Sequence, residues 1–490
     1  MPAESFAARR GSCARVHAPS PRVRTILRAA LSVFVALCAA PAFAWSNHAW
    51  GTWGALKDFA AFERLAPVRV ESLESFLVAQ AEALEPLLDA QEAWARERVP
   101  TYPARPDALR FVAAGTPTPD ELRRRFVAAL RIAPDARLAL FLKRLPRDDA
   151  GQRPALARSR VSTLADDEGE DAANGSPFVA LQEGEMVSPL AVVATASDEP
   201  DYGLDIGVWE DNGTAHGRSY GFGRQPFGNP ALSFGSQAPF HMGFYHESPI
   251  LYRAAGFLQR TYPEYRIHLY RTLALHALRT GHEYWGWRFA GWAMHYVQDL
   301  TQPYHARVLP GVSTVRALWI NALDLLGRPD AKRHAITLVS NRHLALENFQ
   351  RTALAAAAKG ATDGGPLFRA LAGETDDAVV SGSAAGGAEA DEPVFADEDA
   401  RERVARRAEQ AADALDDALA DALPDRYVAD PDFEFGVDAR GIDLYAQLEE
   451  TSPAASEAMT RALVPLMHEY GVHTRAFVRA MLAGREAGRP

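Results

Sequence analysis

The stretch HYVQDLTQPYH, residues 295–305, carries two histidines and an aspartate at spacings that suit the end of a helix. His295 and Asp299 are four residues apart, which places two side chains one turn apart on the same side of an α-helix. Pro303 ends or kinks that helix, so His305 can approach from a loop or from the next turn. Imidazole nitrogens and carboxylate oxygens are the ligands that zinc prefers when no thiolate is available. The stretch therefore predicts a helix whose carboxyl end carries either metal ligands or ordinary polar residues, and the stretch alone does not decide between the two.

A second pair of the same kind lies in HLALENF, residues 343–349, where His343 and Glu347 are again four residues apart. Alone, this pair is weak evidence, because most such pairs on helices are solvated surface pairs. Together with the first motif, it supplies the histidine and carboxylate set that a second ion requires.

Helical patterns dominate the chain on both sides of these motifs. Apolar residues recur at spacings of three and four over 70–99, 262–300, 399–423 and 457–482, which is typical of amphipathic helices. Strand patterns are sparse. The tryptophans of the second segment are expected in the core: Trp285, Trp287 and Trp292. The sequence therefore predicts an all-α fold.

Polar and low-complexity stretches divide the chain. The stretch at about 146–190 predicts a solvated insertion, and 361–400 predicts a flexible linker or loop. Residues 197–248 are rich in glycine, proline and aromatic residues, which is typical of an ordered irregular segment that carries site residues. We expect a main domain over 45–360 and C-terminal helices over 401–490 that pack on it.

Residues 1–44 have the features of an export signal. A basic flank precedes a short apolar run, and Ala42-Phe43-Ala44 gives a cleavage pattern before Trp45. The apolar run is too short for a stable membrane anchor. Both cysteines, Cys13 and Cys38, lie in this segment, so the mature chain would depend on a large core or on metal ions for stability. We therefore expect a periplasmic or secreted protein with no transmembrane segment after removal of the signal.

The charge balance is acidic, with a formal net charge of −11 at pH 7. The first 44 residues hold six of the 52 lysines and arginines and one of the 63 acidic residues, so the mature chain would carry −16. This balance argues against a basic groove that grips polyanions. It does not exclude phosphodiester substrates, because bound divalent cations can supply positive charge locally.

The motifs MHYVQDLTQPYHA and HLALENF, together with WSNH at the expected mature N-terminus, resemble the zinc-dependent phospholipases C and the related single-strand-specific nucleases. The three motifs occur in family order, although they cover a small part of the chain. The resemblance implies a multi-helix domain around a trinuclear zinc site. Relative to a minimal family member, this chain would add loop insertions and extra C-terminal helices.

Carried over to this sequence, the resemblance implies that Trp45 binds one zinc ion through its free α-amino nitrogen and its carbonyl oxygen, joined by His48. Asp299 would bridge that ion and a second ion, which His295 also holds. Cleavage before Trp45 would thus complete the site only after export. His48 lies closer to Trp45 than the equivalent histidine does in the relatives, and the acidic residue that helps one phospholipase branch to read choline has no counterpart at that spacing.

The resemblance assigns the third ion to His305, His343 and Glu347. The second ion still needs a histidine from the irregular segment, where His241 and His246 are the candidates. We prefer His241, which precedes the aromatic pair Phe244-Tyr245, although two more residues intervene than in the family.

The second ion also needs a carboxylate, for which Asp198, Asp201 and Asp205 are the candidates. We prefer Asp201, because the Asp201-Tyr202 pair resembles the phospholipase branch, with Asp198 next. In the family this aspartate has also been assigned a general-base role, so Asp201 is the candidate catalytic residue.

These features predict an exported phosphodiester hydrolase that uses zinc-activated water, since zinc lowers the pKa of bound water toward about 7. Glu347 and Tyr202 favour a phospholipase C over a single-strand-specific nuclease, so the expected substrate is a phospholipid or, alternatively, a single-stranded nucleic acid. A second alternative is a non-catalytic metal-binding or surface-interaction protein. The sequence does not predict the head group, the base preference or the oligomeric state.

Overall fold

The computed structural model describes residues 45, 47–146, 153–164, 176–228, 234–360, 365–374 and 394–487. The expected export signal, residues 1–44, lies outside the described residues. The structure is mostly helical, which confirms the all-α prediction. Within the described ranges the strands form two short antiparallel pairs: β1 (Val68–Arg69) with β4 (Met186–Val187), and β2 (Phe141–Lys143) with β3 (Phe178–Ala180).

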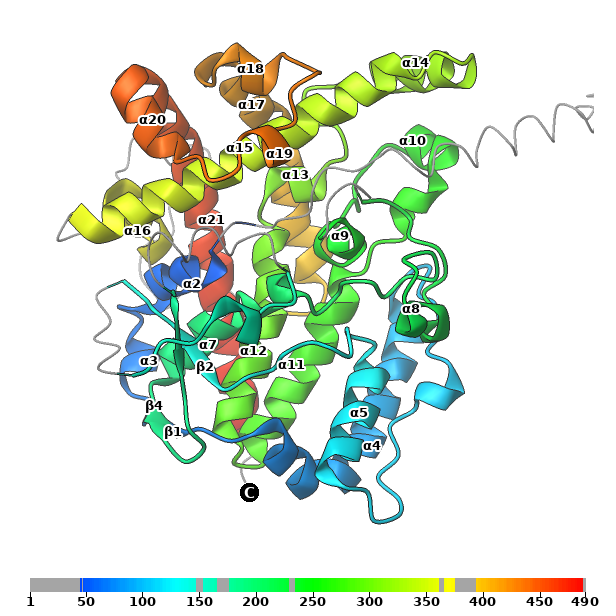
Figure 1. Ribbon diagram of the computed structural model, residues 1–490, viewed down its shortest axis with the longest axis vertical. Coiled ribbons are helices and arrows are strands. Elements are labelled where there is room, and N and C mark those ends of the chain that lie inside the picture. Colours follow the sequence, from blue (N-terminus) through cyan, green and yellow to red (C-terminus); the bar gives the residue numbers. More distant parts are fainter. Residues whose placement is uncertain are drawn as a thin grey trace, which may run out of the picture.

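Helix α12 (Glu283–Asp299) runs through the centre of the molecule (Figure 1). Every residue that follows Glu283 in this helix is buried, which is expected of a helix covered on all sides. Its neighbours are α11 (Pro263–Arg279), α7 (Pro189–Ala196) and the C-terminal α21 (Pro453–Glu486). The motif at residues 295–305 therefore begins inside the core.

A glycine sets the close approach of α7 to α12. A Cβ atom on Gly291 would lie 2.5 Å from the Cβ of Ala196 and 2.8 Å from the carbonyl oxygen of Val193. The absence of a side chain at this position lets the carboxyl end of α7 lie directly against α12. The turn that follows α7, at residues 197–202, is thereby placed beside His295.

Two apolar clusters form most of the core. The first joins α11 and α12 to α4 (Leu73–Arg98) and α5 (Pro119–Leu130), and it includes the three tryptophans predicted to be buried, each with no exposed surface. The second joins α21 to α15 (Asp330–Gly360) and α20 (Leu444–Thr451), and it includes Trp45.

The C-terminal helices pack on the rest of the chain. α21 contacts α2, α11, α12 and α16, and it also contacts α17 (Arg406–Ala422), which a short π-helical stretch (Ala400–Ala405) precedes. The stretch predicted as a linker, 361–400, includes α16 (Gly365–Ala372), whose Leu367 and Phe368 are buried. Part of the stretch expected to be a linker or loop is thus a packed helix.

The predicted polar insertion, 146–190, contains β3 and β4 and leads into α7 at its end, while much of its middle lies outside the described residues. The remaining helices are short or peripheral: α2 (His48–Leu56), α3 (Ala60–Glu63), α8 (Ala215–Tyr220), α9 (Ala238–His241), α10 (Pro249–Ala254), α13 (Pro303–Ala306), α14 (Thr314–Leu325), α18 (Asp425–Val428) and α19 (Phe435–Asp438). Among the described residues no helix is both long enough and apolar enough to cross a membrane.

Candidate metal centre

The carboxyl end of α12 carries His295 and Asp299 one turn apart, and both are fully buried. Nδ1 of His295 lies 2.7 Å from the carbonyl oxygen of Ser197, in the turn after α7. Because a carbonyl oxygen only accepts, Nδ1 carries the proton and donates, and Nε2 faces the centre. Nε2 lies 3.3 Å from Oδ2 of Asp299. The backbone thus fixes the orientation in which His295 can present a nitrogen ligand.

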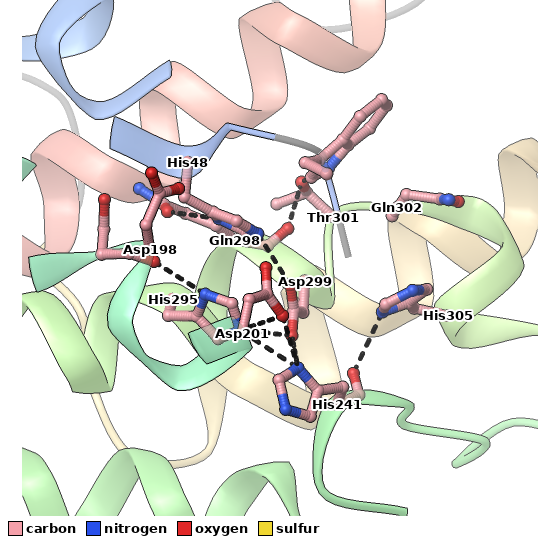
Figure 2. Close-up of polar contacts among 12 residues, drawn as sticks. His48, Asp198, Asp201, His241, His295, Gln298, Asp299, Thr301, Gln302 and His305 are labelled. Atoms are coloured by element: carbon pink, nitrogen blue, oxygen red, sulfur yellow. Dashed lines mark hydrogen bonds and ion pairs between the residues drawn. The ribbon is translucent and has the colours of Figure 1, made fainter. Parts of the chain in front are cut away.

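His241, at the end of α9, joins this pair from the irregular segment. Its Nδ1 lies 2.8 Å from Oδ2 of Asp299 and 3.0 Å from Nε2 of His295 (Figure 2). The alternative candidate, His246, lies elsewhere, with its Nε2 2.8 Å from the carbonyl oxygen of Arg401. Of the two histidines considered from the sequence, the structure brings His241 into the group.

Asp201 is the carboxylate that faces both histidines. Its Oδ1 lies 3.6 Å from Nε2 of His295 and 3.8 Å from Nδ1 of His241. Figure 2 shows Asp201 beside these two residues and Asp299. Its side chain is 13% exposed, whereas the side chains of His241, His295 and Asp299 have no exposed surface. Asp201 is therefore the member of this group that solvent reaches.

The other two aspartates considered from the sequence have different partners. Asp198 accepts hydrogen bonds from the backbone N–H of Ala49, from Nζ of Lys143 and from the Tyr202 hydroxyl, so it lies outside the group. Although burial disfavours its charge, Lys143 lowers the pKa of Asp198.

Asp205 accepts hydrogen bonds from the Arg266 guanidinium at 2.5 Å and from the Tyr296 hydroxyl at 2.6 Å. Its Oδ2 also lies 3.7 Å from Nε2 of His241, on the side of the ring away from Asp299. Asp205 therefore lies near the far side of the His241 ring without a hydrogen bond to it.

The segment that begins α2 approaches Asp299 from the side opposite His241 and His295. Asn47 has a left-handed backbone (φ 70°) and begins α2, so that His48 is its first helical residue. Nε2 of His48 lies 3.2 Å from Oδ1 of Asp299, and Nδ1 lies 2.9 Å from Oε1 of Gln298. The Gln298 amide nitrogen donates to Thr52 and Thr474, so its oxygen faces the histidine and Nδ1 of His48 is the donor.

Trp45 is fully buried, and its indole nitrogen donates to the Thr301 hydroxyl at 2.9 Å. Thr301 follows Asp299 by two residues, so this hydrogen bond holds the start of the expected mature chain beside the centre. The zinc-binding role of the Trp45 backbone remains a prediction.

A third group forms where α13 meets α15. Nε2 of His343 lies 2.6 Å from Oε1 of Glu347, one turn along α15, and Nε2 of His305 lies 4.0 Å from the same oxygen. Nδ1 of His305 donates to the carbonyl oxygen of His241, 3.2 Å away, which ties this group to the previous one. Gln302 also donates to Oε1 of Glu347, at 3.3 Å.

The described residues thus contain three sets of side chains in which one nitrogen or oxygen atom from each residue lies within 4.8 Å of the others. These sets are His48, His295 and Asp299; Asp201, His241 and His295; and His305, His343 and Glu347. The sequence predicted every member of these sets. It did not predict Gln298 and Ser197, which orient His48 and His295 and whose signal is only their nearness to the motif residues.

The pKa values around Asp299 show how strongly these groups interact. Burial alone would lower the pKa of His295, but the carboxylates of Asp299 and Asp201 raise it to about 9. Burial opposes the charge of Asp299, yet His295, His241 and His48 hold the pKa of Asp299 well below its usual range. The centre therefore strongly favours a positive charge beside Asp299.

The pKa values of the two other carboxylates, Glu347 and Asp201, are shifted upward, in the opposite direction to that of Asp299. Burial, together with the charges of Asp201 and Asp299, raises the pKa of Glu347 well above its usual range. Burial and the charge of Asp299 also raise the pKa of Asp201, against the influence of the histidines. Oδ1 of Asp201 and Oε2 of Glu347 are buried oxygens without a hydrogen-bond partner among the described residues.

A divalent cation fits this arrangement. The Nδ1 atoms of His48 and His295 donate to oxygens, so in the neutral ring each Nε2 is a lone pair that faces a carboxylate oxygen. Two acceptors at such distances repel each other unless a proton or a cation lies between them. The donor set of imidazole nitrogens and carboxylate oxygens is the one that zinc prefers. The residues present therefore fit a metal centre, while the identity and number of the ions remain predictions.

Searches against known protein families, curated proteins and solved structures found no match to this chain.

Proposed function

We propose that this protein is an exported, zinc-dependent phosphodiester hydrolase of the phospholipase C type. The observation that carries the proposal is the convergence of the three motifs, which are far apart in the sequence, on one buried centre around Asp299. The histidines and carboxylates of these motifs lie in the three groups of side chains described above, and the zinc-binding role of the Trp45 backbone is part of the proposal.

In this proposal the chain's own residues have distinct tasks. Asp299 holds two sets of ligands together, because its two oxygens face His48 on one side and His241 and His295 on the other. The side chain of Asp201 is 13% exposed, and its buried Oδ1 has no hydrogen-bond partner among the described residues, so we assign it the role of accepting a proton from the attacking water. The bound zinc ions would supply hydroxide near neutral pH and neutralise charge that develops on the phosphoryl oxygens.

A direct test uses purified chain that begins at Trp45 and is loaded with zinc. The substrates are phosphatidylcholine, single-stranded DNA and RNA, and a chromogenic phosphodiester. The proposal expects zinc-dependent turnover of the chromogenic substrate and of phosphatidylcholine, and loss of both in Asp201→Asn by roughly 100-fold or more.

Turnover of nucleic acid without turnover of lipid would instead support the nuclease alternative. If the protein binds zinc but hydrolyses none of these substrates, the enzyme proposal fails and the metal serves stability.

A further inference from the structure

One corner of the molecule exposes large apolar side chains on two neighbouring helices. Val315 is 78% exposed, Trp319 is 63% exposed and Leu326 is 76% exposed. The first two are on α14, and Leu326 directly follows it. Spacings of four and seven residues place the three on one face of the helix, which we call the α14 face. Ile250, on the adjacent α10, is 54% exposed.

The opposite side of α14 is already used for packing. Ala317, Leu318 and Ile320 line a narrow apolar space that α10 and α15 close from the other side. The core contacts of α14 therefore do not account for the α14 face. Trp319 is also unusual in its exposure, because the other eight of the chain's nine tryptophans are buried or partly buried.

The charges around this face are basic. Exposed arginines surround it at four positions: Arg253, Arg316, Arg328 and Arg333. The single acidic residue of α14, Asp324, is neutralised by the buried Lys332 at 2.9 Å. Asp330 forms an exposed pair with Arg333 and leaves the other three arginines in excess. This local excess of positive charge contrasts with the formal net charge of the whole chain, which is −11.

We propose that the α14 face docks on the surface of an anionic phospholipid bilayer. A helix that presents an exposed tryptophan with branched apolar residues, flanked by arginines, has the composition of an interfacial membrane-binding helix. The arginines would pair with lipid phosphates while Trp319 lies at the level of the head groups. A symmetric dimer through this face would set arginine against arginine, which disfavours a second copy as the partner.

Docking at the α14 face would have a consequence for the metal centre, because α14 is connected to helices that carry ligand residues. In chain order α14 follows α13, which carries His305, and precedes α15, which carries His343 and Glu347, and it packs against α15 at the edge of the molecule (Figure 1). A bilayer held at the α14 face would therefore be attached to the two elements that build the third ligand group. The inference goes beyond the proposed function, since a bilayer-binding face does not require catalysis.

The test measures binding to vesicles of phosphatidylcholine with phosphatidylglycerol in equal parts, and to vesicles of phosphatidylcholine alone, by flotation in the presence of a chelator. We expect binding to the anionic vesicles that weakens with added salt. Lipids brominated near the head group should quench the fluorescence of Trp319 in the bound protein, and Trp319→Phe should abolish that quenching.

Two sets of variants test whether the α14 face, rather than another part of the surface, binds the vesicles. Val315→Ser with Trp319→Ser and Leu326→Ser should weaken binding about tenfold or more, and Arg316→Glu with Arg328→Glu should do the same. The matched controls alter other exposed residues, far from α14. They are Val78→Ser with Met186→Ser for the apolar set and Arg124→Glu for the charged set, and they should bind as the wild type does.

All variants should keep the zinc content and the hydrolysis of the chromogenic substrate, which separates failure of this inference from failure of the proposed enzyme. Absence of vesicle binding would overturn the inference. Equal losses in the control variants, or a dimer through this face in light scattering, would also overturn it.

Discussion

At the scale of the residue, Asp299 is the side chain on which the centre depends. It is the carboxylate whose two oxygens face different groups of ligands, one toward His48 and one toward His241 and His295. Glu347, by contrast, faces only its own group. Replacement of each of these two carboxylates therefore compares a residue that we expect to bridge two groups of ligands with one that we expect to serve a single group.

Replacement of Asp299 by Asn should remove more bound zinc than replacement of Glu347 by Gln. One oxygen of Asp299 faces His48 and the other faces His241 and His295, whereas Glu347 faces only His305 and His343. Elemental analysis of the folded proteins after dialysis measures the difference. Equal or negligible losses in the two variants would contradict the bridging role of Asp299.

His268 gives a residue-scale test that does not involve the metal centre. It stacks on Trp94 with ring centroids 3.5 Å apart, and burial lowers its pKa to about 4, against a smaller opposing influence of Asp397. Its ordinary pKa is 6.5. Between these two values the unfolded chain binds a proton that the folded chain does not bind, so this contribution to stability is lost as the pH falls from about 7 toward 4.

His268→Gln should therefore lose less stability than the wild type between pH 7 and pH 5, by on the order of 1–2 kcal/mol in the free energy of unfolding. Urea denaturation at the two pH values measures this. Other histidines titrate in both proteins and cancel in the comparison. Parallel pH dependence in the two proteins would show that His268 titrates normally.

At the scale of the element, the contact between α7 and α12 positions the ligands of the second group. Gly291 allows this contact, and the turn after α7 supplies both the carbonyl oxygen that orients His295 and the side chain of Asp201. Gly291→Ala should force the two helices apart and cost about 1–3 kcal/mol of stability, with loss of zinc. Gly256→Ala is the control, because a Cβ atom there meets nothing within 4 Å. A Gly291 variant with full zinc content and wild-type stability would refute this role.

The helices also show how much of the fold could be predicted from the sequence. Helical periodicity predicted the segments that became α11, α12, α17 and α21, because these are long and their apolar residues recur regularly. It missed α16, whose eight residues lie inside a stretch rich in glycine and alanine, because only the contacts of α16 with α2, α15 and α21 show that it packs.

The choice between Asp198 and Asp201 could not be made from local sequence. Both residues belong to one short turn, and the partner that separates them is Lys143, 55 positions away on β2. Likewise, the contact of His246 with Arg401 depends on a segment distant in the chain. The ligand types could be predicted from their spacing, whereas the selection among neighbours depends on long-range packing.

At the scale of the whole molecule, the centre joins parts of the chain that are distant in sequence. The N-terminal Trp45 and His48, the central α12 and the C-terminal α21 meet there, and the Tyr470 hydroxyl of α21 donates to the carbonyl oxygen of His48 at 3.2 Å. Without a cation, the carboxylates of Asp201, Asp299 and Glu347 disfavour one another's charge. Metal binding should therefore stabilise the whole fold.

A chelator should accordingly lower the melting temperature of the mature protein by roughly 5–10 °C, and zinc should restore it. In Asp299→Asn the shift should be smaller, because less metal is bound at the start. Differential scanning calorimetry measures both values. An unchanged melting temperature in a protein that has lost its metal would separate the centre from folding stability.

We expect the motifs to build one metal centre around Asp299, which a zinc anomalous-scattering map of crystals of the chain that begins at Trp45 would show. Three peaks are expected: one between Trp45, His48 and Asp299, one among Asp201, His241, His295 and Asp299, and one among His305, His343 and Glu347. A well-ordered, fully folded chain without zinc at these side chains, or with zinc bound elsewhere, would contradict this expectation.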